Sequence, residues 1–232
     1  MPAARREQHI RPGLLSDFIL GSQDGLVNVL GILLGLSAAA ASPSIIIVGA
    51  LAALGAESVS MGAVAYTSTR ARRQVYEAER ERELAEMKEL PEMEREEVRT
   101  IFRNWGFAGD ELEEMVRKIE AKPKAMLELM MAFELNLATV SAEQPLNSGL
   151  VVLASTVVGS AIPLVPFLVP GLPLVTSAVA SILLSAGALF GIGWYEARIT
   201  IGSFWKSGAR MLLIGLAAGF AGFLIGHLAH VY

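Results

Sequence analysis

The sequence predicts an all-α integral membrane protein with five transmembrane helices and a helical cytosolic insert between spans 2 and 3. Of its 232 residues, 53% are hydrophobic, and the mean hydropathy of +0.49 exceeds that of an ordinary soluble domain. The apolar residues form three long blocks with almost no charge, rather than the periodic pattern of an amphipathic surface helix. Most charged residues gather instead in segment 71–137, between the first block and the second.

The three apolar blocks hold two, two and one spans, because a helix needs about 20 apolar residues to cross the hydrocarbon core. We expect spans near 16–41, 45–69, 148–169, 173–195 and 208–229. The expected organisation is a cytosolic N-terminus (1–15), spans 1 and 2 (16–69), a cytosolic helical domain (70–137), a linker (138–147) and spans 3 to 5 (148–232). The basic N-terminus and the long first span do not match a removable signal peptide.

Basic residues indicate the orientation of the chain. They gather before span 1, after span 2 and between spans 4 and 5, at Arg5, Arg6, Arg11, Arg70, Arg72, Arg73, Arg198, Lys206 and Arg210. The opposite connections, 41–44 and 169–173, carry no charge. Because cytosolic loops are enriched in Lys and Arg, the N-terminus and the insert are predicted in the cytosol and the C-terminus outside or in a lumen.

The insert is predicted to be a small helical bundle. No glycine or proline interrupts the sequence between span 2 and Pro91, so one long helix should continue out of the membrane. Pro91 suits the first turn of a second helix, which Gly106 would close. Two more helices are expected over 109–121, with Asp110 near its N-cap, and over 124–137.

Glutamates in the insert have a spacing that could bind metal. Residues three apart share a helix face, so two E-x-x-E pairs on helices packed antiparallel across Pro91 would converge. The candidate ligands are Glu83, Glu86, Glu94 and Glu97, with Glu79, Met130, Met131 and Glu134 beside them. Converging carboxylates repel unless a cation neutralises them, and oxygen with thioether suits Fe²⁺, Mn²⁺ or Co²⁺ better than Mg²⁺ alone. The alternative is a solvated helix of Glu and Arg ion pairs, the usual meaning of such a charge run.

Two acids lie inside the first apolar block. An ionisable residue at the centre of a span costs roughly 2.5–3.5 kcal/mol, and it is a functional candidate by default. Asp24 lies on span 1, while Glu57 and Met61 lie one turn apart on span 2. These three could line one ion path; alternatively, Asp24 lies near the interface and only hydrogen-bonds a neighbouring helix. Nothing in the sequence indicates an enzyme, and the absence of cysteine excludes disulfides and thiolate ligands.

The ordered set of motifs resembles the vacuolar iron transporter family over nearly the whole chain. The matching stretches are DGLVNVLGILLG (24–35), ESVSMGAVAYTSTR (57–70) and the Glu-rich insert ending in MMAFELNL (130–137). The resemblance implies a homodimer that exports ferrous iron, and often manganese, from the cytosol in exchange for protons. It places Asp24 and Met61 on the ion path, and it makes Glu83, Glu86, Glu94, Glu97, Met130 and Glu134 the metal ligands of the insert, with Met131 and Glu79 as further candidates.

The resemblance implies no permanent cofactor: the ion is the cargo, Fe²⁺ first, with Mn²⁺, Co²⁺ and Zn²⁺ as alternatives. Expected partners are the bilayer, protons and a second copy, and not nucleic acid; the membrane would be the plasma membrane of a prokaryote or the vacuolar membrane of a eukaryote. Rival hypotheses are a manganese or broad divalent exporter, and a membrane sensor or scaffold that binds metal without transporting it. One departure concerns the second motif, where many members carry an acid and this chain has Ala65.

Overall fold

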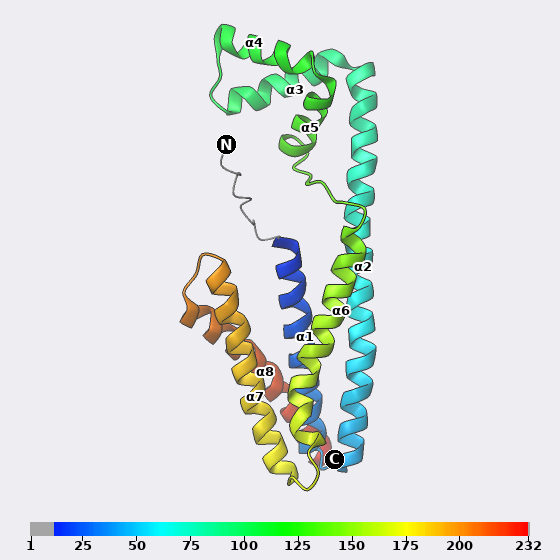
Figure 1. The fold of residues 1–232 in the computed structure, drawn as a ribbon, viewed down its shortest axis with the longest axis vertical. Helices are drawn as coiled ribbons and strands as arrows, with labels where there is room; N and C mark the ends of the chain where they lie inside the picture. The colour runs from blue at the N-terminus through cyan, green and yellow to red at the C-terminus, as the bar shows by residue number, and fades with distance from the viewer. Residues whose placement is uncertain (1–11, 232) are drawn as a thin grey trace, which may run out of the picture. The chain divides into compact units, whose positions relative to one another are not determined.

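A computed structural model describes residues 12–231 of the chain, and all its regular elements in this range are helices. In chain order they are α1 (Pro12–Ala38), α2 (Pro43–Glu89), α3 (Pro91–Asn104), α4 (Gly109–Glu120), α5 (Pro123–Phe133), α6 (Gln144–Leu164), the 3₁₀ helix η1 (Val165–Leu168), α7 (Leu174–Ile199) and α8 (Phe204–Val231). Figure 1 shows this order along the chain. The N-terminal arginines used for the orientation, Arg5, Arg6 and Arg11, lie outside the described residues.

Five helical segments of the described chain are long and apolar enough to cross a membrane. They are Gly13–Ala38, Pro43–Glu89, Gln144–Leu168, Leu174–Ile199 and Phe204–Ala229. The prediction of an all-α membrane protein with five spans is therefore confirmed. Span 1 ends earlier than expected, at Ala38, because the chain turns at Ala40, which has a φ of 54°.

The chain divides into two compact units. The membrane unit comprises the residues up to Tyr66 together with those from Leu146 onward, and the insert unit is Thr67–Pro145. Helix α2 contributes residues to both, because it runs without interruption from Pro43 to Glu89. The single long helix expected from the uninterrupted sequence before Pro91 is thus present.

The membrane unit is held together by apolar packing and by small residues. Val29 and Leu33 of α1 pack with Ile46 of α2 and Leu164 of α6 in one buried cluster. Helix α1 also packs along α8 and α7. At several of these contacts a glycine lets two backbones approach closely. This is common between membrane helices, because they associate largely through van der Waals packing, and small residues allow that packing to be tight.

Gly159 of α6 marks one of these close approaches, against the backbone of Ser22 on α1. A Cβ atom at Gly159 would collide with the carbonyl oxygen of Ser22, whereas a Cβ at Gly187 on α7 would meet nothing within 4 Å. Backbone cannot yield as a flexible side chain can, so Gly159→Ala should destabilise the protein by about 1–3 kcal/mol. Thermal unfolding in detergent would measure the effect, with Gly187→Ala as the matched control. Equal melting temperatures for the two variants would contradict this close packing.

The insert unit has its own apolar core. Buried residues of α3, α4 and α5 form it, namely Val98, Phe102, Leu112, Val116, Met126 and Met130. Pro91 is in the first turn of α3, as predicted, and Gly106, with a φ of 96°, follows its last turn. Asp110 lies in the first turn of α4, but Ala108 is the N-cap and makes no side-chain capping bond. Asp110 is therefore not the N-cap, but an acid in the first turn is favoured by the helix dipole.

Candidate functional site

Three glutamates of the insert unit converge where α2 meets α3. Glu83 and Glu86 of α2 and Glu94 of α3 each offer one carboxylate oxygen, and these oxygens lie within 4.8 Å of one another. The convergence follows from the local sequence: α2 ends at Glu89, and Pro91 starts α3 after a single intervening residue, Leu90. The chain thus turns between the two helices within one residue, and this turn brings Glu83 and Glu86 of α2 close to Glu94 of α3.

Two of these glutamates, Glu83 and Glu94, are buried. Glu94 is 1% exposed and Glu83 is 3% exposed. Among the described residues, Oε2 of Glu83 and both carboxylate oxygens of Glu94 have no hydrogen-bond partner. Burial of a carboxylate without a partner is costly, and a native structure rarely leaves such a group unsatisfied. A bound cation or bound protons would resolve this cost.

The pKa values of the buried acids show how strongly the cluster disfavours negative charge. Burial, followed by the charges of Glu97 and Glu83, raises the pKa of Glu94 from 4.5 to about 7. Burial, followed by the charge of Glu86, raises the pKa of Glu83 and that of Glu97. A divalent ion would compete with protons for these carboxylates.

Glu134 joins the same electrostatic group from the end of α5, where it is the C-cap residue. Partial desolvation, followed by the charges of Glu97 and Glu83, raises the pKa of Glu134 to about 7. Its side chain is exposed, so solvent should screen this shift more than that of the buried Glu94. The E-x-x-E pairs and Glu134 therefore interact as one group of five acids.

Glu79 does not join the three-carboxylate cluster. Its Oε2 accepts a hydrogen bond of 3.4 Å from the guanidinium of Arg82, one turn along α2. The Nε of Arg82 also donates to Oε1 of Glu86, at 3.1 Å. Arg82 thus provides positive charge at the edge of the cluster, and Glu79 acts as its ion-pair partner.

The two methionines of α5 are both buried, Met130 at 0% and Met131 at 2% exposure. Met130 packs in the apolar core of the insert with Val98 and Phe102. Apolar packing therefore accounts for the burial of Met130, and a role for its sulfur as a metal ligand stays a prediction, as it does for Met131.

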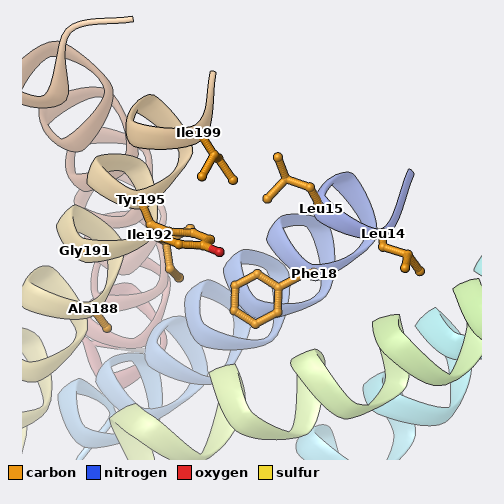
Figure 2. Close-up of a pocket in the computed structure, with 8 residues that line it drawn as sticks. All are labelled: Leu14, Leu15, Phe18, Ala188, Gly191, Ile192, Tyr195 and Ile199. Carbon is orange, nitrogen blue, oxygen red and sulfur yellow. The ribbon is translucent and has the colours of Figure 1, made fainter. Parts of the chain in front are cut away.

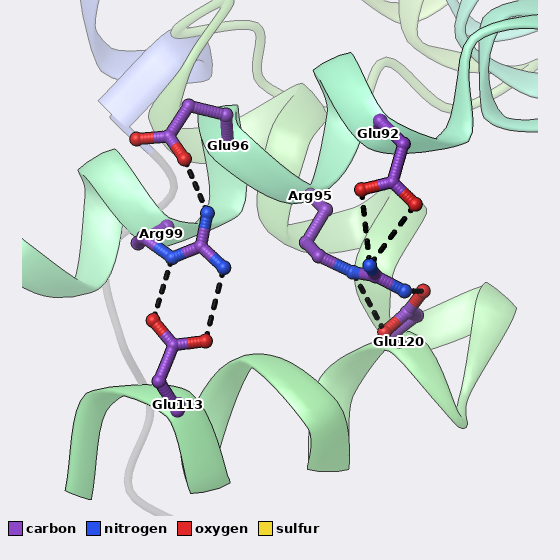
Figure 3. A network of polar contacts seen from close by, with 6 residues as sticks. All are labelled: Glu92, Arg95, Glu96, Arg99, Glu113 and Glu120. Carbon is purple, nitrogen blue, oxygen red and sulfur yellow. Dashed lines mark hydrogen bonds and ion pairs between the residues drawn. The ribbon is translucent and has the colours of Figure 1, made fainter. Parts of the chain in front are cut away.

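Helix α3 carries its arginines toward α4. Arg95 donates to both oxygens of Glu120, and Arg99 donates to both oxygens of Glu113 at 2.7 and 2.9 Å, as Figure 3 shows. A guanidinium fits a carboxylate in this two-bond geometry particularly well. These arginines are engaged with α4, so they are not the partners of Glu94.

The membrane unit brings Asp24 and Glu57 together, and their place on one ion path stays a prediction. The Nδ2 of Asn28, one turn after Asp24 on α1, donates a short hydrogen bond to Oε1 of Glu57 on α2. The charge of Asp24 also acts on the Glu57 carboxyl. Met61, one turn after Glu57, is half-buried. The sequence analysis did not single out Asn28, because it searched the apolar blocks for ionisable residues and asparagine is uncharged.

Asp17 is a further membrane acid that the sequence analysis missed. It lies in the first candidate span, and its Oδ2 accepts a hydrogen bond of 2.6 Å from the Ser148 hydroxyl of α6. Asp17 precedes Asp24 by seven residues, so both lie on one face of α1. Asp17 lies within the expected span 16–41, one residue before the nearly charge-free stretch that begins at Phe18, and the sequence analysis did not single it out.

A groove of about 780 Å³ between α1 and α7 is unsuited to a metal ion. Its lining residues, shown in Figure 2, are Leu14, Leu15, Phe18, Ala188, Gly191, Ile192, Tyr195 and Ile199. Tyr195 is the one lining residue with a polar side chain, and its single hydroxyl cannot replace the hydration shell of a divalent cation. The acidic groups described above are therefore the candidate ion sites.

The sequence model of the VIT family matches residues 15–227, which include all five spans' cores and the insert. This chain belongs to the VIT family. Individual relatives also align with most of the chain. It is 32% identical to vacuolar iron transporter 1 of Eucalyptus grandis over 220 residues, which are 94% of this chain and 88% of that protein.

The similarity extends to other relatives. The VIT chain is 32% identical to vacuolar iron transporter 1 of Arabidopsis thaliana over 221 residues, with the same coverage. It is 24% identical to Protein CCC1 of Saccharomyces cerevisiae over 227 residues, 94% of this chain and 70% of that protein. VIT proteins are transporters and not enzymes, so this VIT protein is a multi-pass membrane transporter of metal ions.

Proposed function

We propose that this VIT protein exports Fe²⁺ from the cytosol in exchange for protons. The observation that carries the proposal is the convergence of Glu83, Glu86 and Glu94. Among the described residues, one buried oxygen of Glu83 and both buried oxygens of Glu94 have no hydrogen-bond partner. Its relatives in plants are named vacuolar iron transporters, which supports iron as the cargo. The insert would bind the ion first, and the membrane acids would then carry it across.

The donor set of the insert supports a divalent transition metal. Five acids, Glu83, Glu86, Glu94, Glu97 and Glu134, interact electrostatically. Burial and the charges of neighbouring acids of this group raise the pKa of Glu83, Glu94, Glu97 and Glu134. Carboxylate oxygen suits Fe²⁺ and Mn²⁺, which tolerate varied geometry, whereas Mg²⁺ keeps most of its waters. Met130, Met131 and Glu79 remain proposed neighbours of the site rather than assigned ligands.

The membrane path would run along one face of α1. Asp24, Glu57 and Met61 are its proposed ligands, with Asp17 as a proposed approach residue. Protons returning down their gradient would protonate these carboxylates and weaken metal binding, which couples the two flows. Secondary transport of this kind needs no nucleotide or permanent cofactor.

Exposed polar groups on the spans support a homodimer. In the single chain Asn28 is exposed, and Asp24 and Glu57 are only half-buried. Contact of such groups with lipid would be costly. A second copy covering this face would remove that cost. The Lys and Arg distribution supports the insert in the cytosol and the C-terminus outside, across a plasma membrane in a prokaryote or a vacuolar membrane in a eukaryote.

Two other functions compete with this proposal. A manganese or broad divalent exporter would use the same oxygen ligands, and Ala65 at the family's acidic position bears on this choice. A sensor or scaffold would bind metal at the insert and transport nothing. Competition among Fe²⁺, Mn²⁺, Co²⁺ and Zn²⁺ separates the first rival, and a flux assay separates the second.

The deciding experiment is metal flux into proteoliposomes with an imposed pH gradient. The full-length protein should move Fe²⁺ when the gradient drives protons in the opposite direction, and flux should fall when an ionophore collapses the gradient. Metal binding to the detergent-solubilised protein without any flux under either condition would favour the sensor or scaffold instead.

Glu94 is the insert acid whose loss should weaken metal binding most. It is buried and lacks a hydrogen-bond partner among the described residues. Glu94→Gln keeps the shape but removes the charge, so the affinity of the full-length protein for Mn²⁺ should fall roughly 10- to 100-fold. Titration calorimetry would measure this, with the exposed Glu111→Gln on α4 as the matched control. An unchanged affinity would remove Glu94 from the ligand set.

A further inference from the structure

We infer that Asn28 is a positioning residue of the transport path, which holds the Glu57 carboxylate in place and thereby sets the affinity of the membrane site. This inference rests on the proposed function, because it assumes that the ion passes Asp24 and Glu57. It assigns a role to a side chain that contributes no charge and that belongs to α1, the opposite helix from Glu57.

The hydrogen bond fixes the orientation of both groups. A carboxylate only accepts hydrogen bonds, so the amide nitrogen of Asn28, and not its oxygen, must face Glu57. The bond joins Nδ2 to Oε1 between residues 29 apart in sequence. Because the nitrogen faces Glu57, the amide oxygen is turned away from it. A neutral oxygen of this kind is a ligand that divalent ions accept beside carboxylates.

The spacing of the polar residues favours a role on the path over simple helix pairing. Asp24 and Asn28 are four residues apart on α1, and Glu57 and Met61 are four residues apart on α2. Residues four apart lie on the same helix face. Glu57 interacts with both Asp24 and Asn28, so its carboxylate is held between them rather than free to rotate.

The alternative is that Asn28 only stabilises the pairing of α1 with α2. Interhelical hydrogen bonds between polar side chains in membranes contribute modestly to stability. A positioning role predicts something else: loss of Asn28 should weaken the ion's interaction with the path through Glu57, and it should leave metal binding at the insert unchanged. These two roles can be separated by kinetics.

The test is Fe²⁺ flux into proteoliposomes containing the full-length protein. Asn28→Leu keeps the size of the side chain but removes the donor, and it should raise the KM for Fe²⁺ about tenfold, the loss expected for one hydrogen bond to a charged group. Asn28→Gln keeps the donor on a longer chain and should recover part of this loss. Asn104→Leu, at the exposed end of α3, is the control and should transport as the wild type does.

A double variant shows whether Asn28 acts through Glu57. If it does, Asn28→Leu combined with Glu57→Gln should transport no worse than Glu57→Gln alone, because the removed bond has lost its acceptor charge. Additive losses, or a wild-type KM for Asn28→Leu, would overturn the inference. Unchanged Mn²⁺ binding at the insert, with normal elution in size-exclusion chromatography, verifies that Asn28→Leu folds.

The same assay keeps this inference separate from the proposed function. If the wild type moves no metal, or moves it equally well without Asp24, the proposed path is wrong and the inference falls with it. If wild-type flux depends on Asp24 but not on Asn28, only the positioning role is wrong.

Discussion

Replacement of Asp24 by Asn should abolish metal transport while leaving metal binding at the insert intact. Asn keeps the size and polarity of the side chain but removes the charge that would hold a divalent ion beside Glu57. Loss of a residue that only orients a metal ligand commonly lowers metal affinity or activity 10- to 100-fold. Loss of a residue that binds the ion directly should lower transport at least as much. We therefore expect Fe²⁺ flux in proteoliposomes to fall roughly 100-fold or more.

Two controls make this result specific to the path. Asp110→Asn removes an exposed acid from α4 and should transport normally. Calorimetric titration of the Asp24→Asn protein with Mn²⁺ should give the wild-type affinity at the insert, because Asp24 belongs to the membrane unit and Glu94 to the insert unit. A flux within a factor of two of the wild type would show that the ion does not pass Asp24.

Local spacing rules were sufficient to predict much of the fold and the insert cluster. The three apolar blocks, which carry almost no charge, predicted the spans, because hydropathy identifies the segments that can enter a bilayer. The proximity of Glu83 and Glu94 followed from Pro91, since a helix that must stop and restart within two residues brings its flanking turns together. Residues three apart on each helix then face the same side.

Contacts between distant segments could not be predicted in this way. The Asp17–Ser148 hydrogen bond joins residues 131 apart, and the Asn28–Glu57 bond joins α1 to α2. Both depend on how the helices are rotated about their axes, which apolar periodicity does not determine when a span is hydrophobic all round. Similarly, the pairing of Arg99 with Glu113 of α4 rather than with the acidic cluster depends on the packing of α3.

Lowering the pH from 7.5 to 5.5 should weaken metal binding at the insert by roughly ten- to several-hundredfold. The pKa of Glu94 and that of Glu134 are both raised to about 7. Each acid must lose its proton before it can hold a metal ion, so protons compete increasingly as the pH falls below 7. Titration of the full-length protein with Mn²⁺ at several pH values would give the affinity directly.

The stability of the metal-free protein should change in the opposite direction. The pKa of Glu94 is about 7 in the folded protein and 4.5 for an unperturbed glutamate. The folded protein therefore binds this proton more tightly than the unfolded chain does. Its contribution is complete below about pH 4.5 and is lost as the pH rises through 7. The metal-free insert should therefore melt at a lower temperature at pH 8 than at pH 5.5, and Mn²⁺ should raise the melting temperature mainly at pH 8. In Glu94→Gln both pH effects should shrink; if they persist undiminished, the competition between protons and metal does not occur at this carboxylate.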